Sequence, residues 1–235
     1  MQQTQTDIAE TTNGTIPSLV HGERMTRAEF ERRYHAMPPH IKAELIEGVV
    51  SMPSPVRYEQ HSGPHWDVIT WLGNYRAFTP GLGGAAEGTV RLGDSSEPQP
   101  DAALFILPGH GGRVRISVDD YLENGPELVA EVAASSIPLD TGLKLQMYLR
   151  YDVQEYIICR VPDHEIDWFV RRDSQFVQLA PDQDGRLCSE VFPGLWLDAD
   201  ALIRGDMAQV LSVLQLGLAT AEHAAFVSRL NPPAS

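Results

Sequence analysis

An acidic residue inside an otherwise apolar segment constrains this chain more than any other feature. Residues 128–134 read LVAEVAA, so apolar side chains occupy both alternating sets of positions. This pattern predicts a short strand that is buried on both faces. Glu131 lies in its middle, where an uncompensated carboxylate would cost several kcal/mol. We therefore expect a cation, a metal ion or a bound proton to compensate Glu131.

A helix is predicted after this strand, and a lysine on this helix can lie close to Glu131. Ser136 and Asp140 are candidate caps for its N-terminus. Lys144 and Tyr148 have the i,i+4 spacing and therefore share one face of the helix. A buried-strand acid followed by such a lysine is the most informative pattern in the sequence.

The overall charge limits the classes of function. The 235 residues carry a formal net charge of −14, and the pI is near 4.9. Proteins that bind nucleic acids constitutively are usually basic, although a local patch or a divalent metal ion can offset acids at one site. With 43% hydrophobic residues, the composition is that of a soluble, acidic globular protein.

The cysteines and the absence of targeting signals indicate the compartment. Cys159 and Cys188 form no C-x-x-C pair, and Cys159 ends an apolar run, which favours a buried inert thiol over a disulfide. Residues 1–15 lack the basic and apolar regions of a signal peptide. No segment approaches the roughly 18 apolar residues of a membrane span. We therefore expect a cytoplasmic protein with no membrane part.

The first half of the chain is predicted to alternate helices and strands. Thr26 and Glu29 form a capping box for a helix that ends near Tyr34. Two apolar runs in residues 43–52 flank Glu-Gly, which favours a hairpin. The other expected elements are a helix at 64–77 with the apolar stripe Trp66, Ile69, Leu72 and Gly73, a loop at 79–84, strands at 85–92 and 101–107, and an insertion at 108–126 with one helical turn at 118–122.

The second half is predicted to form a meander followed by helices. Residues 154–159, 165–170 and 175–179 are three consecutive strands with short connections, which is typical of an antiparallel meander. A short strand is expected at 192–198. Apolar residues at helical spacing predict one or two helices at 206–230.

Several segments, taken in chain order, resemble one known family. They are ELIEG, PQPDAALF, ELVAEVAASS, the spacing Lys144-x-x-x-Tyr148, EYIIC and FPGLWLD. Over residues 25–203 they are similar to the restriction-endonuclease family called Uma-two, which belongs to the PD-(D/E)xK nuclease-like superfamily. The resemblance implies an α/β (α+β) fold, with a restriction-endonuclease-like mixed central sheet flanked by helices. It also implies phosphodiester hydrolysis in DNA with Mg²⁺, or Mn²⁺ as an alternative ion.

Composition and the resemblance together suggest a division of the chain. We expect a disordered tail at 1–22 from its polar, Thr- and Gln-rich composition, the nuclease-like domain at 23–205 from the resemblance, and a helical extension at 206–235 from its apolar spacing. The resemblance also suggests a set of site residues. Asp101 matches the acid of the family's P-D motif, Glu131 the acid of its E-V-x-S segment, and Glu44 the glutamate of its hairpin. These three acids are the implied metal ligands and catalytic residues. Lys144 is the implied fourth catalytic residue.

Two positions depart from the family patterns. The superfamily's lysine stands two residues after the second acid, but here that position is Ala133, and the lysine of the next helix, Lys144, takes its place. His61 stands where the family often has a histidine, and it is an auxiliary candidate. Here the Gly63-Pro64 pair follows it, which disturbs the local pattern.

General chemistry supports these roles. Phosphodiester cleavage needs a cation that neutralises the transition state and lowers the pKa of the attacking water. Mg²⁺ favours one or two carboxylates and otherwise keeps its waters, and Asp101 and Glu131 can supply them from neighbouring strands. Lys144 would orient the water or stabilise developing negative charge. Glu44 could bind a second ion or bridge through water.

Each assignment has a structural alternative. Asp101 could begin a strand at a solvated edge, and Glu44 could be a surface acid of the hairpin. Lys144 could form an ordinary surface pair with Asp140, worth about 0.2–0.5 kcal/mol. For Tyr148, packing in the core is favoured over a catalytic role.

The histidine pair and the arginine clusters also have structural alternatives. His61 and His65 have the i,i+4 spacing of a zinc pair, but Gly63-Pro64 between them argues against one helical turn. Solvated surface is the favoured interpretation of the basic clusters Arg171-Arg172 and Arg113-x-Arg115.

Two classes of function follow from the sequence. The first is a metal-dependent endonuclease acting on DNA. The second is a catalytically inactive nuclease fold that acts as a binding module or self-associates as a homodimer through its carboxy-terminal helices. The acidic balance favours the second class, and the retention of Glu131 in apolar surroundings favours the first.

Overall fold

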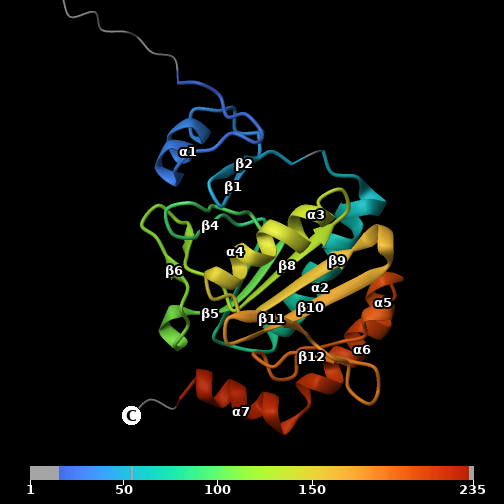
Figure 1. Cartoon of the computed structure of the whole chain (residues 1–235). Coiled ribbons are helices and arrows are strands. Elements are labelled where there is room, and N and C mark those ends of the chain that lie inside the picture. The colour runs from blue at the N-terminus through green and yellow to red at the C-terminus, as the bar shows by residue number, and fades with distance from the viewer. Residues whose placement is uncertain (1–15, 54, 233–235) are drawn as a thin grey trace, which may run out of the picture.

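A mixed β-sheet forms the centre of the computed structural model, which describes residues 16–53 and 55–232. Its six strands lie in the order β11-β10-β9-β8-β5-β3, and only β8 and β9 pair in parallel. The fold therefore agrees with the mixed central sheet that the sequence predicts (Figure 1). The strands are β3 (Leu82–Ala86), β5 (Ala102–Ile106), β8 (Leu128–Ala133), β9 (Glu155–Arg160), β10 (Glu165–Arg172) and β11 (Gln175–Gln178).

The central position of β8 explains its composition. Every one of its residues is buried, because β5 and β9 cover both of its edges and helices cover both faces. Leu128 and Val132 face one layer, whereas Val129 and Ala133 face the other. Glu131, which alternates with Val132, therefore points to the same side as Val129 and Ala133. The register pairs Ala102 with Ala130, so Asp101 and Glu131 occupy adjacent positions on neighbouring strands.

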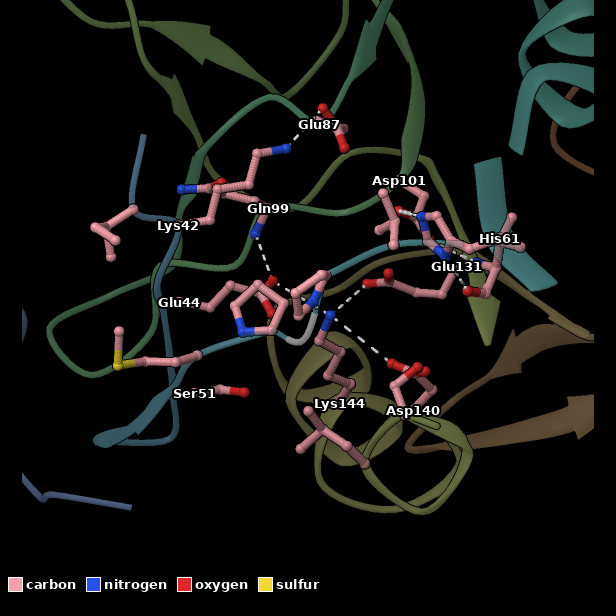
Figure 2. A pocket seen from close by; sticks show the side chains of 18 of the residues that line it. Lys42, Glu44, Ser51, His61, Glu87, Gln99, Asp101, Glu131, Asp140 and Lys144 are labelled. Atoms are coloured by element: carbon pink, nitrogen blue, oxygen red, sulfur yellow. Dashed lines mark hydrogen bonds and ion pairs between the residues drawn. The ribbon is translucent and has the colours of Figure 1, made fainter. Parts of the chain in front are cut away.

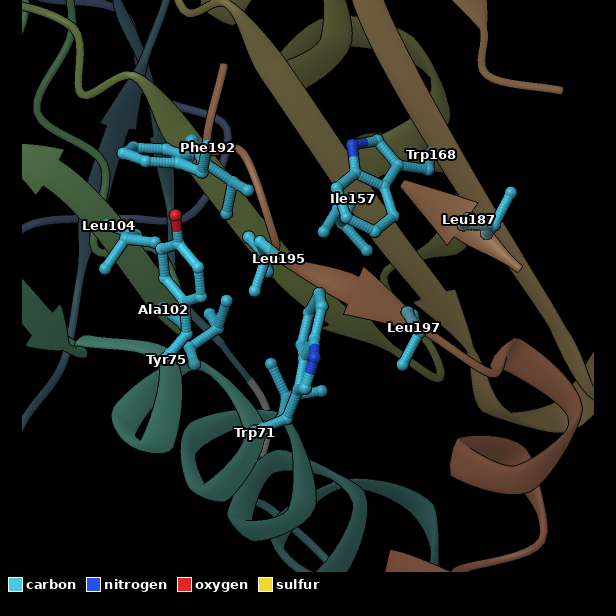
Figure 3. Close-up of a cluster of buried hydrophobic side chains, with 14 of the residues drawn as sticks. Trp71, Tyr75, Ala102, Leu104, Ile157, Trp168, Leu187, Phe192, Leu195 and Leu197 are labelled. Carbon is cyan, nitrogen blue, oxygen red and sulfur yellow. The ribbon is translucent and has the colours of Figure 1, made fainter. Parts of the chain in front are cut away.

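Two hydrophobic layers enclose the sheet. On one side, Trp71 and Tyr75 of helix α2 (Gly63–Ala77) pack against Leu195, Leu197 and Trp168 (Figure 3). Helices α5 (Ala199–Ile203) and α6 (Met207–Leu218) complete this layer. On the other side lie α3 (Ile137–Leu139), the π-helical turn η3 (Asp140–Lys144) and α4 (Leu145–Arg150).

Helix α2 is formed as predicted, but its buried face differs from the predicted stripe. Trp66 is 72% exposed, and Gly73 and Ile69 are not part of the fully buried set. The buried residues are Val68, Trp71, Leu72 and Tyr75, which follow the i, i+3, i+4, i+7 pattern. Both stripes satisfy helical spacing, and the one with the aromatic pair Trp71 and Tyr75 reaches the sheet.

The hairpin lies above the α4 side of the sheet with helix α1 (Arg27–Tyr34). Strands β1 (Glu44–Ile46) and β2 (Val49–Ser51) pair antiparallel, as predicted. Glu47 and Gly48 adopt positive φ values of 50° and 76°, the conformation of a tight two-residue turn. Thr26 caps α1 by accepting a hydrogen bond from Glu29 N at 3.4 Å, which confirms the predicted capping box in part.

Residues 16–22, part of the predicted disordered tail at 1–22, are instead packed against the hairpin. Leu19 is buried with Phe30, Leu45 and Val50, and Gly22 N donates to Val50 O at 2.8 Å. Apolar contacts therefore hold this part of the chain to the hairpin. Residues 1–15 lie outside the described residues.

The middle of the chain departs from prediction in two places. The predicted loop at 79–84 and weak strand at 85–92 are instead β3 and a separate β4 (Val90–Arg91), because β3 pairs with β5 along five residues. Residues 118–122 form no helical turn. They connect β6 (Arg115–Ile116) with β7 (Leu122–Glu123), and β7 also pairs with β4.

The carboxy-terminal part forms a short strand pair and helices. Strands β12 (Leu187–Cys188) and β13 (Trp196–Leu197) pair antiparallel. Two helices, α6 and α7 (Ala221–Leu230), follow as predicted, and Asp206 caps α6 through Gln209 N. Val210, Leu214 and Phe226 belong to the main core, so the predicted extension packs on the domain. The remaining elements are the π-helical turn η1 (Tyr58–Ser62) and the 3-10 turns η2 (Pro108–His110) and η4 (Val161–Asp163).

The expected burial of Cys159 is confirmed. Cys159 is buried in the core, and neither it nor Cys188 forms a disulfide. Within the described ranges, no single helix is long and apolar enough to cross a membrane, and α6 with α7 reaches that length and hydropathy only as a pair bent by 71°.

Candidate active site

A pocket of about 550 Å³ gathers every site residue that the sequence predicts. It opens between the hairpin, the start of β5, the middle of β8 and the helical segment after β8 (Figure 2). Five acids, two lysines and two histidines line it: Glu44, Glu87, Asp101, Glu131, Asp140, Lys42, Lys144, His40 and His61. Residues far apart in the sequence therefore share one cavity.

Lys144 lies at the centre of three carboxylates. Its Nζ is 3.0 Å from Glu131 Oε1, 3.2 Å from Glu44 Oε1 and 3.7 Å from Asp140 Oδ1. Burial alone would lower the pKa of Lys144, but the charges of these three acids raise it. The lysine is thus a buried ammonium, and the alternative of a surface pair with Asp140 is wrong.

Glu131 receives two hydrogen bonds from the helix that follows its strand. Lys144 Nζ donates to Oε1 at 3.0 Å, and Tyr148 Oη donates to the same oxygen at 2.9 Å. Burial raises the pKa of Glu131 well above its usual range, and the charge of Lys144 opposes this rise. Tyr148 packs in the core as expected. Its hydroxyl also touches the site, which the sequence pattern did not indicate.

Glu44 is a buried acid and not a surface residue of the hairpin. It begins β1, and its Oε1 accepts a hydrogen bond from Gln99 N at 2.7 Å. Its side chain is only 11% exposed because the segment before β5 covers it. The hairpin therefore brings a third carboxylate to Lys144 from outside the central sheet.

Asp140 is a further acid of the site that sequence reasoning treated as a helix cap. It lies inside the π-helical turn and is buried. Burial raises the pKa of Asp140, and its Oδ1 is a buried oxygen that receives no hydrogen bond. The i,i+4 spacing to Lys144 was visible in the sequence. Its burial was not, because it depends on the hairpin and the sheet.

Asp101 is held by both a strand and a histidine. It precedes β5, an interior strand between β3 and β8, so the alternative of a solvated strand edge is wrong. Its Oδ2 accepts a hydrogen bond from Val132 N at 2.6 Å, and its Oδ1 is 3.2 Å from His61 Nε2. Burial opposes ionisation, yet the contact with His61 and the Val132 N–H hold the pKa of Asp101 below its usual value.

His61 and His65 lie on one continuous helical segment, contrary to expectation. The turn η1 ends at Ser62 and runs directly into α2, because Ser62 and Gly63 both have right-handed helical dihedrals. Pro64 follows the join of η1 and α2, where the N–H of Gly63 donates to Tyr58 O in the π-helical pattern. The two imidazole rings are consequently 5.7 Å apart.

The basic clusters lie outside this pocket. Arg171 pairs with Asp152, and Arg172 pairs with Glu190. Arg113 contacts Glu127 at 3.7 Å and donates to Asp152 O. Their pairing supports the surface interpretation that the sequence favoured.

The charge of the pocket is suited to a divalent cation. Its five carboxylates outnumber its two lysines, and the neighbouring acids add to the effect of burial in raising the pKa values of Glu131 and Asp140. The Oδ1 of Asp140 is buried and receives no hydrogen bond, so it is free to serve as a ligand. Carboxylate oxygens are the donors that Mg²⁺ and Mn²⁺ take, so the residues present fit such an ion.

Comparison with known proteins places this chain in a family. The Uma2 model, described as "Putative restriction endonuclease", matches residues 27–200. The chain belongs to the Uma2 family. Among solved structures, this Uma2 chain resembles the crystal structure of "a putative nuclease belonging to DUF820" from Anabaena variabilis. The TM-score is 0.51 at 15% identity, and the match covers 78% of this chain and 97% of the other. At this identity the likeness shows the fold alone. No curated protein matches the chain.

Proposed function

We propose that this protein is a metal-dependent endonuclease that hydrolyses phosphodiester bonds in DNA, with Mg²⁺ or alternatively Mn²⁺ as the ion. The observation that carries the proposal is the placement of Lys144, which contacts Glu131 at 3.0 Å inside the pocket that Asp101 also lines. Two acids from adjacent strands and one amine are the groups that such chemistry requires. Membership of a family described as restriction endonucleases supports the same reaction class.

Asp101 and Glu131 would hold the ion, and Glu44 would bind a second ion or bridge through water. When bound, the ion would neutralise charge on the scissile phosphate and lower the pKa of the attacking water. Asp101 is held ionised by its contacts with His61 and Val132 N, which keeps it ready as a ligand. Glu131 would give up a proton or its Lys144 contact in order to act as a ligand.

Lys144 would supply the positive charge on the protein side. Its ammonium carries three donors, and they now face Glu131, Glu44 and Asp140. A phosphate oxygen or the attacking water in the pocket would accept one of them in place of a carboxylate. Tyr148 orients Glu131 through its hydroxyl, and His61 orients Asp101. Both are positioning residues.

One observation favours the second candidate function, a catalytically inactive binding or self-association module. Lys144 is already fully paired with acids, and the net charge of −14 disfavours DNA. Such a set of ion pairs can be retained because it stabilises the fold, without any catalytic role. The two candidates differ in whether the pocket responds to metal and cleaves DNA.

The decisive experiment joins a cleavage assay with a binding assay. Supercoiled plasmid is incubated with Mg²⁺ or Mn²⁺, and thermal melting is followed with Ca²⁺ or Mn²⁺. We expect nicking that EDTA abolishes, and a rise in Tm, because an ion that binds only the native state stabilises it. Glu131→Gln and Asp101→Asn should each lower the rate by at least about 100-fold.

Asp173→Asn is the matched control for this experiment. Asp173 is exposed in the turn between β10 and β11, at a positive φ that asparagine tolerates. This variant should nick at the wild-type rate. If wild type neither nicks plasmid nor shifts its Tm with metal, the endonuclease proposal is wrong and the binding module is favoured.

A further inference from the structure

Three metal-ligating side chains meet on the histidine side of Asp101. One ligand atom each from His61, His65 and Asp101 lies within 4.8 Å of the others, and the described residues contain no other such group of three. Ligands of one tetrahedral zinc ion at about 2.0–2.1 Å lie roughly 3.4 Å apart. Side-chain shifts of about 1 Å would therefore bring these atoms to coordinating distance.

The helix supplies the two imidazoles in a suitable arrangement. His61 and His65 are separated by one helical turn on the continuous segment formed by η1 and α2, and their rings are tilted by 48° to each other. Two histidines at this spacing on one helix, completed by a carboxylate from elsewhere, form a known arrangement of zinc ligands. Neither side chain belongs to the Lys144 cluster.

The hydrogen bond of the first imidazole frees its other nitrogen for a cation. His61 Nδ1 lies 2.9 Å from Val132 O, which can only accept, so Nδ1 carries the proton. In the neutral ring Nε2 then has a lone pair, and it faces Asp101 Oδ1 at 3.2 Å. Two lone pairs repel at that distance unless a proton or a metal ion lies between them. The Val132 carbonyl acts as the outer partner that fixes a metal-binding histidine.

The second imidazole is held against the same aspartate. His65 Nε2 lies 2.7 Å from the backbone oxygen of Asp101. An ion bound through His65 would replace the proton of this hydrogen bond. Lys144 approaches Glu44, Glu131 and Asp140, and no ion pair joins it to Asp101 within the described part of the chain. A cation beside Asp101 is therefore spared direct contact with the ammonium.

From this geometry we infer that His61, His65 and Asp101 form a site for a borderline divalent metal ion, Zn²⁺ or Mn²⁺, in preference to Mg²⁺. Imidazole nitrogen favours these ions, whereas Mg²⁺ favours oxygen. The inference rests on the proposed function, because Asp101 is shared with the proposed Mg²⁺ site. The inference adds a second metal position with nitrogen ligands, and it specifies which ions that position favours.

Calorimetric titration of the full, untagged chain with ZnCl₂ and separately with MgCl₂ tests the inference. Wild type should bind one Zn²⁺ at least about 100-fold more tightly than Mg²⁺. His65→Asn and His61→Asn should each weaken Zn²⁺ binding at least about tenfold, and His65→Asn should leave Mg²⁺ binding unchanged. His35→Asn, at an exposed position after α1, is the matched control and should bind both ions as wild type does.

The outcomes separate this inference from the proposed function. Equal affinity for the two ions, or unchanged Zn²⁺ binding in both folded histidine variants, overturns the histidine site, even if Mg²⁺-dependent nicking persists. Selective, histidine-dependent Zn²⁺ binding without nicking under any metal supports the site and overturns the nuclease instead. A melting curve of each metal-free variant establishes that it is folded, and the two histidine variants provide independent tests.

Discussion

Lys144 illustrates how a single side chain sets the charge balance of a buried site. Three acids, Glu44, Glu131 and Asp140, surround its ammonium. Burial raises the pKa values of Glu131 and Asp140, and the neighbouring acids add to this rise while the charge of Lys144 opposes it. The cluster is therefore a buried ammonium among acids whose ionised forms are disfavoured by burial.

Replacing this lysine tests the description. Lys144→Met leaves the acids without a buried cation and should lower the free energy of unfolding by about 3–5 kcal/mol. Carboxyl groups with a raised folded-state pKa contribute stability below their unfolded values of about 4, and this contribution is lost as pH rises through the folded pKa. Removing the ammonium raises these pKa values further. Urea unfolding should therefore show a larger difference from wild type at about pH 8 than at about pH 5.

The other lysine of the chain provides the control for that prediction. Lys42 pairs with Glu87 at 2.8 Å, and both side chains are exposed. Lys42→Met should change the free energy of unfolding by less than about 1 kcal/mol, with little dependence on pH. A loss from Lys144→Met no larger than that of Lys42→Met would contradict a buried ammonium. A loss that shrinks as pH rises would contradict the charge balance.

At the scale of the elements, helix α2 shows why spacing alone does not choose a buried face. Its sequence contains two overlapping apolar stripes, and only the one with Val68, Trp71 and Tyr75 packs on the sheet. Trp71 also donates its indole N–H to Trp196 O at 3.0 Å. The exposed Trp66 lacks such contacts, because it points away from the sheet.

A matched pair of substitutions on this one helix measures the difference in stability between its buried and its exposed face. Trp71→Ala removes a fully buried aromatic side chain and should cost about 3–5 kcal/mol of stability. Trp66→Ala should change stability by about 0.5 kcal/mol or less, although it deletes the same atoms from the same helix. Urea unfolding with far-UV circular dichroism gives both values. Equal losses would show that the two faces of α2 are buried alike.

The individual elements also explain how much of the site could be predicted from sequence. Strand β8, the hairpin and the meander were predictable, because each depends on a local pattern of apolar residues. The adjacency of Asp101 and Glu131 followed from strand order. The alignment of His61 with His65 was missed, because a π-helical turn carries the helix back through Pro64. The burial of Asp140 was missed for a different reason: segments that are distant in the sequence enclose it.

For the whole molecule, the carboxy-terminal helices connect the fold with the question of assembly. Val210 and Leu214 of α6 lie in the same core as Trp71 and Leu197, so the apolar stripe of α6 is covered by its own domain. Leu216, on the opposite side of α6, is 55% exposed. Self-association through the buried stripe would require this helix to leave the core. The homodimer expected as one alternative therefore has only the outer face of α6 available on this helix.

Two changes to this segment separate a structural role from an assembly role. A chain that ends at residue 205 would uncover the core face of α2, and we expect it to aggregate or to lose its cooperative thermal transition. Leu216→Asp alters only the exposed face, so its mass by light scattering and its Tm should equal those of wild type. A halved mass for Leu216→Asp would assign the outer face of α6 to a dimer interface. A truncated chain that stays soluble and melts cooperatively would instead show that the domain ends before α6, because a helix that completes the core cannot be removed without exposing it.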